Sequence, residues 1–436
     1  MGILGAMQTA VSGMQAQAYA LDNISGNIAN SQTIGFKRID TSFLDLVPDL
    51  ALSTRLTGGV SAISQTTNAV AGAFRMTGVP TNVAISGDGF FAVSKKSSDA
   101  TGTVTFSSSP FFTRRGDFSV DVNNHLINGA GQYLMGYAVD PISGAVKDGV
   151  VKTIQIPTTD LPPAATTAIK YEGNLPVTPT NEMQSNGSLT PSTAGSTILA
   201  NGESAFLDKT ISGGSLTIYD TSGTAMNLQL RWAKTSSGQW DLYYMSNSAA
   251  TGTQAKWTSL GPAATFNASG KLTSASPLSS SFTIDGRSSG SAISINLSNL
   301  SQYGDTNGVF RQSNISQDGH SSASLTNMEI SNQGRIYAKY SNGLQVPVAD
   351  IAIAHFNGEE ALKRGDGGAY EVSDQSGEPI YGLNGSSIMI NGVEGSNADI
   401  SQEFTRMIAT QQAYSANAKV ITTAQDMMRE AVNVIR

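Results

Sequence analysis

Apolar residues recur at alternating steps of three and four at both ends of the 436-residue chain, and this spacing constrains the fold more than any other feature. A repeat of 3.5 residues gives a helix one apolar stripe, which faces a partner helix in a coiled coil. The N-terminal stripe comprises Leu4, Met7, Val11, Met14, Leu21 and Ile28, with Ala18 and Ser25 at the intervening positions. The C-terminal stripe comprises Phe404, Met407, Tyr414, Ile421, Met428, Val432 and Ile435, interrupted by Gln411, Ala418 and Gln425. We therefore expect residues 1–30 and 396–436 to form a terminal helical domain whose two stripes make an assembly seam.

The C-terminal helix is expected to be long, because no proline occurs between Ala398 and Arg436. At a rise of 1.5 Å per residue it would measure about 55 Å. Ser401, followed by Glu403, is a suitable helix start. The alternative is that both ends form ordinary amphipathic helices on a globular core, although such helices usually carry wider apolar stripes.

Between the ends the sequence predicts mainly β structure. Short runs of β-branched and aromatic residues, such as SLTIYD (215–220), NLQLRWAK (227–234) and RIYAKY (335–340), are separated by turn residues. Charged residues make up 14% of the chain, against about 25% in an average protein. A weakly charged surface lets many copies pack together with little repulsion. The predicted fold class is a mainly β, multidomain protein with α-helical coiled-coil termini.

Composition divides the β region into nested domains. Residues 148–320 are rich in Ser, Thr and Gly, contain all three Trp and include the Pro-rich IPTTDLPPAA, so we expect an inserted outer β domain there. Residues 73–147 and 321–395 flank it and are expected to form one discontinuous β domain. Residues 31–72 have few charges and no clean periodicity, and are interpreted as an extended connector.

The sequence offers no set of residues that an enzyme would need. His125, His320 and His355 each stand alone, without a zinc-type pairing or a G-x-S-x-G motif beside them. The glycines of SGDGFF (86–91) do not extend to a dinucleotide motif and are interpreted as a tight turn. DVNNHLING (121–129) resembles a calcium loop, but Gln132 stands where a bidentate Glu is needed, so a hairpin turn is expected. We expect no catalytic, cofactor or metal site, and no enzyme.

Charge and cysteine content bear on partners and compartment. A net charge of -7 and the scattered basic residues give no reason to bind nucleic acid or an anionic membrane. No stretch of about 20 apolar residues is present to span a bilayer. The absence of cysteine favours an exported bacterial protein without disulfides. Since the N-terminus lacks the features of a Sec-type signal peptide, export without a cleaved signal is expected.

Motifs at both ends resemble those of the bacterial flagellar rod and hook family of axial proteins. The resemblance lies in LDNISGNIANSQTIGFKR (21–38) and SNADISQEFTRMIATQQAYSANAKVITTAQDMM (396–428). GAFRMTGVPTNVAISGDGFFAV (72–93), FTRRGDFSVDVNNHLINGAGQYLMGY (112–137) and YSNGLQVPVADIAIAHFNG (340–358) are similar to the family's shared β domain. Together these motifs cover roughly half the chain, in the expected order. The long insert and the YSNG segment favour the hook branch of the family, whereas the insert itself matches only thinly.

The resemblance implies a hollow helical homopolymer in which the terminal helices line a channel and the β domains stack outside. It further implies an extracellular location on the flagellum, where the tube would act as a universal joint in motility. The implied partners are further copies of the chain, the distal rod, the hook cap, the hook–filament junction proteins and the flagellar type III export apparatus. A distal rod protein and a secreted β-rich adhesin are the alternatives, and an adhesin would give the paired helical termini no role.

Apolar positions beside the predicted seam would need neighbouring copies to cover them. We expect this of Ile3, Ile24, Ile408, Val420 and Val434. Met residues within the seam pack adaptably, which suits a joint that bends while it rotates. The connector at 31–72 is expected to accommodate part of the strain.

Overall fold

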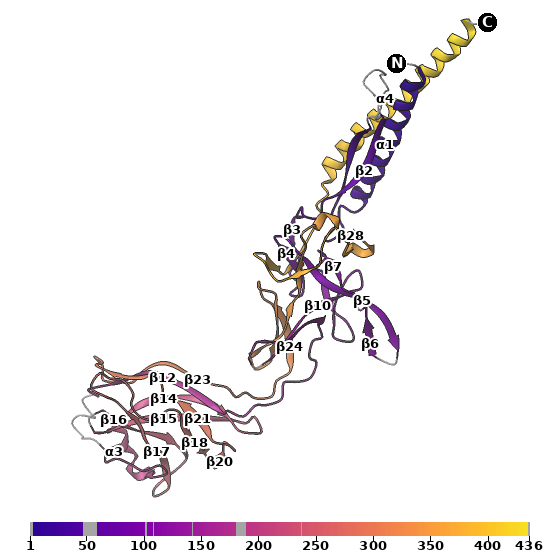
Figure 1. Ribbon diagram of the computed structural model, residues 1–436. Helices are drawn as coiled ribbons and strands as arrows, with labels where there is room; N and C mark the ends of the chain where they lie inside the picture. The colour runs from indigo at the N-terminus through magenta and orange to yellow at the C-terminus, as the bar shows by residue number, and fades with distance from the viewer. Residues whose placement is uncertain are drawn as a thin grey trace. The chain divides into compact units, whose positions relative to one another are not determined.

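The computed structural model describes residues 3–46, 59–100, 103–107, 109–141, 143–179, 189–236 and 238–434. The chain divides into two compact units. Unit 1 comprises Met1–Thr158, Thr326–Lys339 and Leu344–Arg436, and unit 2 comprises Thr159–Leu325 and Tyr340–Gly343. Long helices at the two ends and strands between them confirm the predicted fold class (Figure 1).

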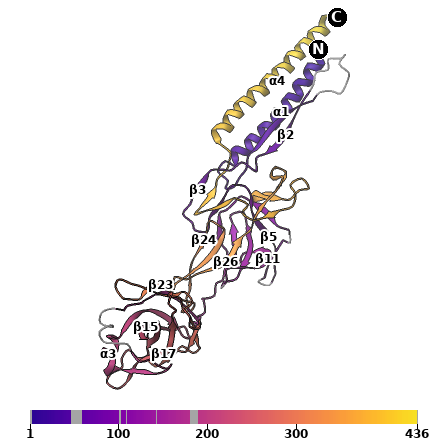
Figure 2. The same ribbon diagram turned by 60° about the vertical axis from the view of Figure 1, so that its left-hand side comes forward.

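Two long helices of unit 1 lie side by side, α1 (Ile3–Ala29) and α4 (Ile400–Val434) (Figures 1 and 2). In both views the C-terminal end of α4 continues past the start of α1. The first turn of α4 is capped by Asp399, whose Oδ1 accepts the Gln402 N–H at 2.9 Å. The helix therefore begins at Ile400, one residue before the predicted start at Ser401, because a carboxylate caps the exposed N–H groups as well as a hydroxyl does.

The segment predicted as an extended connector contains a β-hairpin. β1 (Ile39–Leu46) and β2 (Gly59–Thr66) pair antiparallel from Ile39 opposite Thr66 to Leu46 opposite Gly59. Its strands carry Ser, Thr and Asp among a few apolar residues, so alternation is too weak to reveal them.

The β part of unit 1 draws strands from both sides of the insertion. The central sheet path runs β24 (Leu325–Ile330), β25 (Arg335–Tyr340), β26 (Gln345–Ile351), β10 (Gln132–Val139), β5 (Phe90–Ala100), β7 (Phe111–Thr113), β29 (Ala369–Glu371) and β28 (Lys363–Arg364). Attached to this path are β6 (Thr103–Phe106), β8 (Phe118–Val120), β9 (Leu126–Asn128), β11 (Val146–Thr153), β27 (Ile353–His355) and β30 (Ile380–Tyr381). Phe90 and Phe112 from one side of the insertion share a core with Phe356 and Tyr370 from the other.

Two small antiparallel pairs complete unit 1 and join segments far apart in the chain. β3 (Phe74–Met76) pairs with β32 (Gly392–Glu394), and β4 (Val83–Ser86) pairs with β31 (Ser387–Ile390). The SGDG segment forms the expected turn between β4 and β5, with φ of 103° at Gly87 and 105° at Gly89. The 121–125 segment turns between β8 and β9, as its interpretation as a hairpin predicts.

Unit 2 has two main sheets that share one core. One sheet runs β13 (Thr197–Leu199), β17 (Ala255–Thr265), β16 (Gln239–Met245), β15 (Ala225–Ser236) and β14 (Thr210–Tyr219). The other contains β18 (Leu278–Ser280), β21 (Ile293–Asn296), β12 (Ala168–Pro176), β22 (Leu300–Tyr303) and β23 (Arg311–Gln317), and a short pair joins β19 (Thr283–Ile284) to β20 (Arg287–Ser288). Short helices α3 (Glu203–Leu207) and η1 (Ala200–Gly202) follow β13. Tyr171, Trp232 and Trp240 are fully buried between the sheets, and Trp232 Nε1 donates to the Tyr171 hydroxyl at 2.9 Å.

The division between the units falls later in the chain than the composition predicts. β11 lies inside the predicted 148–320 insert for most of its length, yet it pairs with β10 of unit 1. The chain enters unit 2 only within the Pro-rich segment, at residue 159.

Candidate functional site

The two terminal helices meet through small side chains. The face of α1 that is buried carries Ala10, Gly13, Ala16 and Ala20, followed by Ile24 and Asn27 near its end. At Gly13 the approach is so close that a Cβ atom would lie 2.9 Å from Asn417 Nδ2 of α4. Small residues let two helix backbones come near each other, so this face makes the contact within the chain.

The predicted N-terminal stripe lies beside this contact face. Leu4 is 71% exposed and Val11 is 39% exposed. The other members, Met7, Met14, Leu21 and Ile28, are half-buried. The stripe is displaced by about one residue from the positions that α4 covers.

The predicted C-terminal stripe divides between two faces of α4. Met407, Ile421 and Met428 are half-buried on the face that also carries the buried Glu403 and Ala424. Phe404, Tyr414 and Val432 point outward, with exposures of 48%, 39% and 64%. Ile435 lies outside the described residues.

Leu4, Val11, Phe404, Tyr414 and Val432 of the predicted assembly seam are thus not paired within the single chain. Ile24 was expected to need a neighbouring copy, yet it is buried within the chain at 7% exposure. The physical reason is size: Gly and Ala allow the closest helix approach, and the bulkier residues are left on flanking faces. The outward-facing part of the predicted seam is therefore available to other molecules.

A second contact on α1, which the sequence did not indicate, comes from the β1–β2 hairpin. The Tyr19 hydroxyl lies 2.7 Å from Ser64 Oγ, and Asn23 Nδ2 donates to Thr41 Oγ1 at 2.9 Å. These contacts join polar side chains, which carry no periodic apolar signal, so hydropathy analysis misses them.

The base of the helix pair is fixed by a buried amide and carboxylate. Asn27, 1% exposed, donates to the Ile39 carbonyl and accepts the Ile39 N–H, both at 2.9 Å. Its Nδ2 also donates to Glu403 Oε2 at 3.2 Å, and Glu403 is fully buried. Arg406 then bridges Glu403, at 3.2 Å, to Asp40, at 2.6 Å. The end of α1, the start of β1 and the start of α4 are thereby held together.

A buried ionic cluster continues this junction into the β part of unit 1. Glu394 Oε1 accepts from Lys37 Nζ at 2.5 Å and from the Gly72 N–H at 2.7 Å, and its Oε2 lies 3.5 Å from Arg114 Nη1. Lys37 and Arg114 are 0% and 1% exposed. Burial lowers the pKa of Lys37 even though Glu394 raises it, because removing an ammonium from water outweighs the pairing. Three distant segments of the chain converge on one carboxylate.

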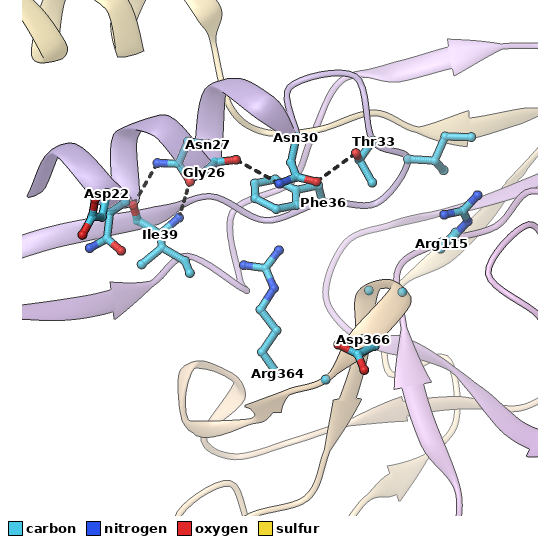
Figure 3. Close-up of a pocket in the computed structure, with 15 residues that line it drawn as sticks. Asp22, Gly26, Asn27, Asn30, Thr33, Phe36, Ile39, Arg115, Arg364 and Asp366 are labelled. Atoms are coloured by element: carbon cyan, nitrogen blue, oxygen red, sulfur yellow. Dashed lines mark hydrogen bonds between the residues drawn. The ribbon is translucent and has the colours of Figure 1, made fainter. Parts of the chain in front are cut away.

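The cleft beside this junction has a volume of about 400 Å³ and is lined by both polar and apolar residues (Figure 3). Arg364 lies over the Phe36 ring at 4.3 Å and donates to the Lys37 carbonyl at 2.8 Å. On the other side, Arg115 pairs with Asp117 through two contacts of 2.8 Å. Asn30 is bonded to the Gly26 carbonyl and to Thr33. Arg364 and Arg115 therefore already make contacts within the chain, and the cleft brings no nucleophile and base together.

The histidines occupy separate structural positions. His125 packs against Phe106 and Tyr133, with ring centroids 5.2 and 5.9 Å away. His355 Nε2 lies 2.9 Å from the Gly382 carbonyl, and His320 Nδ1 lies 3.1 Å from the Ser321 carbonyl. Among the described residues no group of acidic, His or Cys side chains is arranged to hold a metal ion. Within the same residues, neither long helix combines the length and apolar character that crossing a bilayer requires.

Four family models match separate segments of the chain. Flagella basal body rod protein matches residues 7–37, and Flagellar hook protein FlgE/F/G D1 domain matches 84–177. Flagellar basal body protein FlaE D2 domain matches 208–320, and Flagellar basal body rod FlgEFG protein C-terminal matches 391–434. The two terminal matches contain most of α1 and α4.

Relatives align over the full length of the chain. The flagellar hook protein FlgE of Brucella suis biovar 1 (strain 1330) is 29% identical over 440 residues, covering 100% of both proteins. That of Escherichia coli (strain K12) is 28% identical over 434 residues, covering 98% of this chain and 100% of the relative. Among solved structures, the Helicobacter pylori flagellar hook protein FlgE2 covers 72% of this chain and 98% of its own, with 16% identity and a TM-score of 0.49.

Proposed function

Because the chain belongs to the flagellar hook protein family and is a structural subunit of the hook, we propose that it polymerises into a hollow, bendable helical tube. This tube couples the rod of the rotary motor to the filament as a universal joint. In it, residues 1–30 and 396–436 form the inner wall, and the two β units form the outer layers. The protein has no enzymatic role.

The exposed part of the predicted seam carries this proposal. Leu4, Val11, Tyr414 and Val432 remain in contact with water in the single chain, although each is a large apolar or aromatic residue. Long-lived exposure of such residues along two paired helices is costly, and contact with neighbouring copies relieves it. The low content of charged residues favours the same outcome, because copies packed side by side repel each other little.

Partners and export follow from this role. The tube joins the distal rod at one end and the hook–filament junction proteins at the other, and grows beneath a hook cap. The subunit reaches the cell exterior through the flagellar type III export apparatus, without a cleaved signal peptide.

Charged substitutions on the exposed seam test the function. In a variant carrying Val11→Asp and Tyr414→Asp, assembly would bury two unpaired carboxylates, which costs several kcal/mol. We expect soluble monomers with unchanged circular dichroism and no tubes by electron microscopy. Substitutions at Met407 or Ile421 would be less informative, because these half-buried side chains lie on the α1-facing side of α4.

A matched variant controls for added charge. Gln15→Asp with Gln402→Asp also adds one charge to each helix, at exposed polar positions outside the stripe, and we expect it to form tubes. Normal tubes from the Val11 and Tyr414 variant would mean that the stripe faces water in the assembly.

A further inference from the structure

The first turns of α4 carry an apolar stripe that no other part of the described chain covers. Ile400, Phe404 and Ile408 are 39%, 48% and 56% exposed and follow one another at intervals of four. Residues four apart lie on the same face of a helix, so the three side chains form one continuous ridge. Their exposed neighbours Ser401, Thr405 and Gln412 are uncharged.

The far end of the helix pair carries an apolar groove of about 530 Å³ between α1 and α4. Its lining includes Ile3 and Ala6 from α1 and Val420, Ala424 and Met427 from α4. Val420 and Met427 are 45% and 55% exposed, so the groove is open. It lies near the point where α4 continues beyond the start of α1 (Figures 1 and 2).

The ridge and the groove face opposite sides of α4. Phe404 and Val420 are 16 residues apart, which at about 100° per residue turns their directions by roughly 160°. The same 16 residues separate them by about 24 Å along the helix. One chain cannot bring the two surfaces together, whereas two chains can.

We infer that the Phe404–Ile408 ridge of one copy seats in the Ile3–Val420–Met427 groove of a neighbouring copy. Parallel neighbours joined in this way are displaced by about 24 Å along α4. The contact is heterologous, since ridge and groove are different surfaces, and each added copy presents a free ridge and a free groove. It therefore propagates without closing. The inference rests on the proposed function and assigns the surfaces by which its helices join.

Size and charge both favour a second copy as the occupant. An enclosed aromatic side chain buries roughly 150–250 Å², and Phe404 and Ile408 are about half exposed. The contact thus removes on the order of a few hundred Å² from water, well below the roughly 1,200 Å² of a stable pair. It is too small to hold a free partner, yet sufficient when many copies repeat it. Among the described residues that line the groove, Lys419 is the one cation, and it reaches water on its flexible stem. The uncharged ridge brings no counter-charge to bury.

Cysteine cross-linking tests the contact directly, because the chain contains no cysteine. In tubes of a Phe404→Cys and Val420→Cys chain, mild oxidation is expected to give a ladder of covalent multimers, while dilute monomer gives none. The control pairs Phe404→Cys with Thr422→Cys, which is exposed at the height of Val420 but on the ridge side of α4. This control is expected to give no ladder. Tubes without a ladder, an intramolecular link or an equal ladder from the control would each overturn the inference.

A coupling measurement covers the case in which the double-cysteine chain fails to assemble. Phe404→Ala and Val420→Ala are each expected to raise the critical concentration for tube growth about fivefold to tenfold, and together no more than either alone, since both remove one contact. If the increases in critical concentration caused by the two substitutions multiply in the double variant, the two side chains do not contact each other. Wild-type chain that forms no tubes would instead contradict the proposed function, so the two failures are distinguishable.

Discussion

Replacing Glu394 by Ala removes the carboxylate on which three segments of unit 1 converge. Lys37 Nζ, 2.5 Å from Glu394 and fully buried, would keep only the Val70 carbonyl at 2.7 Å. Arg114, 1% exposed, would lose its contact at 3.5 Å. Removing one member of a buried ionic group costs about 3–5 kcal/mol, because the remaining charge is left uncompensated. This is a large share of the roughly 5–15 kcal/mol that stabilises a folded domain.

Replacing the other member of the ion pair, by Lys37→Met, is expected to lower the free energy of unfolding far less. Glu394 would retain the Gly72 N–H at 2.7 Å and Arg114 as a counter-charge. A methionine fills a similar volume without a buried ammonium, so we expect a loss of about 1 kcal/mol. The surface substitution Glu378→Ala, at an exposed site, is expected to change stability by less than about 0.5 kcal/mol.

Urea unfolding of the monomer measures these differences with an internal reference. All three Trp residues, 232, 240 and 257, lie in unit 2, so Trp fluorescence follows that unit while circular dichroism follows both. With a denaturant slope of about 2–3 kcal/mol per M, Glu394→Ala is expected to lower the unit 1 midpoint by about 1–2 M and leave the fluorescence midpoint unchanged.

The pH dependence of the same variant gives an independent check. Burial already lowers the pKa of Lys37, and loss of Glu394 removes the contribution that raises it. In the variant, the unfolded chain then binds this proton more strongly than the folded chain, so stability rises with pH up to the ordinary lysine value near 10.5. The loss of unfolding free energy caused by Glu394→Ala should therefore become smaller as pH rises towards that value. Equal losses for Glu394→Ala and Lys37→Met, or a penalty independent of pH, would refute the assignment of Glu394 as the essential charge.

Two further substitutions test the helix pair and the β core. Gly13→Leu would push α1 away from Asn417, so it is expected to lower the free energy of unfolding by about 1–3 kcal/mol and to reduce the helicity of the monomer measured by circular dichroism. In the control Gly26→Ala, nothing lies within 4 Å of the new Cβ, so helicity should increase. Burial raises the pKa of Tyr370 to about 12. The folded chain therefore holds this proton more tightly than the unfolded chain, and unit 1 loses stability as pH rises above 10. Tyr370→Phe should lose less stability in alkaline urea titrations, and a loss equal to that of the wild type would contradict this role of Tyr370.

The helices could be predicted from the sequence, but the faces they use could not. A 3.5-residue repeat of large apolar residues correctly locates helical segments at both ends, because periodicity depends only on spacing. The stripe it selects, with Leu4 and Val11, is nevertheless outward-facing, while Ala10, Gly13 and Ala16 are buried and Gly13 packs against Asn417 of α4. Hydropathy ranks residues by apolar size, whereas close helix contact favours small ones. Side-chain size along each candidate face is the signal that would have separated the two.

The β1–β2 hairpin and the junction beneath the helices were beyond sequence reasoning for a different reason. Their stability comes from specific polar pairs between distant positions, such as Asn27 with Glu403 and Lys37 with Glu394. Such a pair has no period and no fixed spacing, since its members are brought together only by the fold. The single buried lysine is visible in the sequence only as part of the family-like GFKR motif.

These polar pairs also bear on where a bending tube can yield. The segment 31–72 was expected to accommodate strain, yet Asn68 Nδ2 donates to the Glu359 carbonyl at 2.9 Å and Asn397 Nδ2 donates to Thr67 Oγ1 at 3.1 Å. Together with the buried Lys37–Glu394 pair, these contacts tie the segment to the β part of unit 1 and to the start of α4. Stretching it would expose an ion pair and several buried hydrogen bonds at once, which costs several kcal/mol. Sliding one half-exposed side chain such as Ile408 along a neighbouring apolar groove breaks no hydrogen bond and costs far less. Within this subunit, the contacts that yield most easily are therefore the outward-facing apolar ones on α1 and α4.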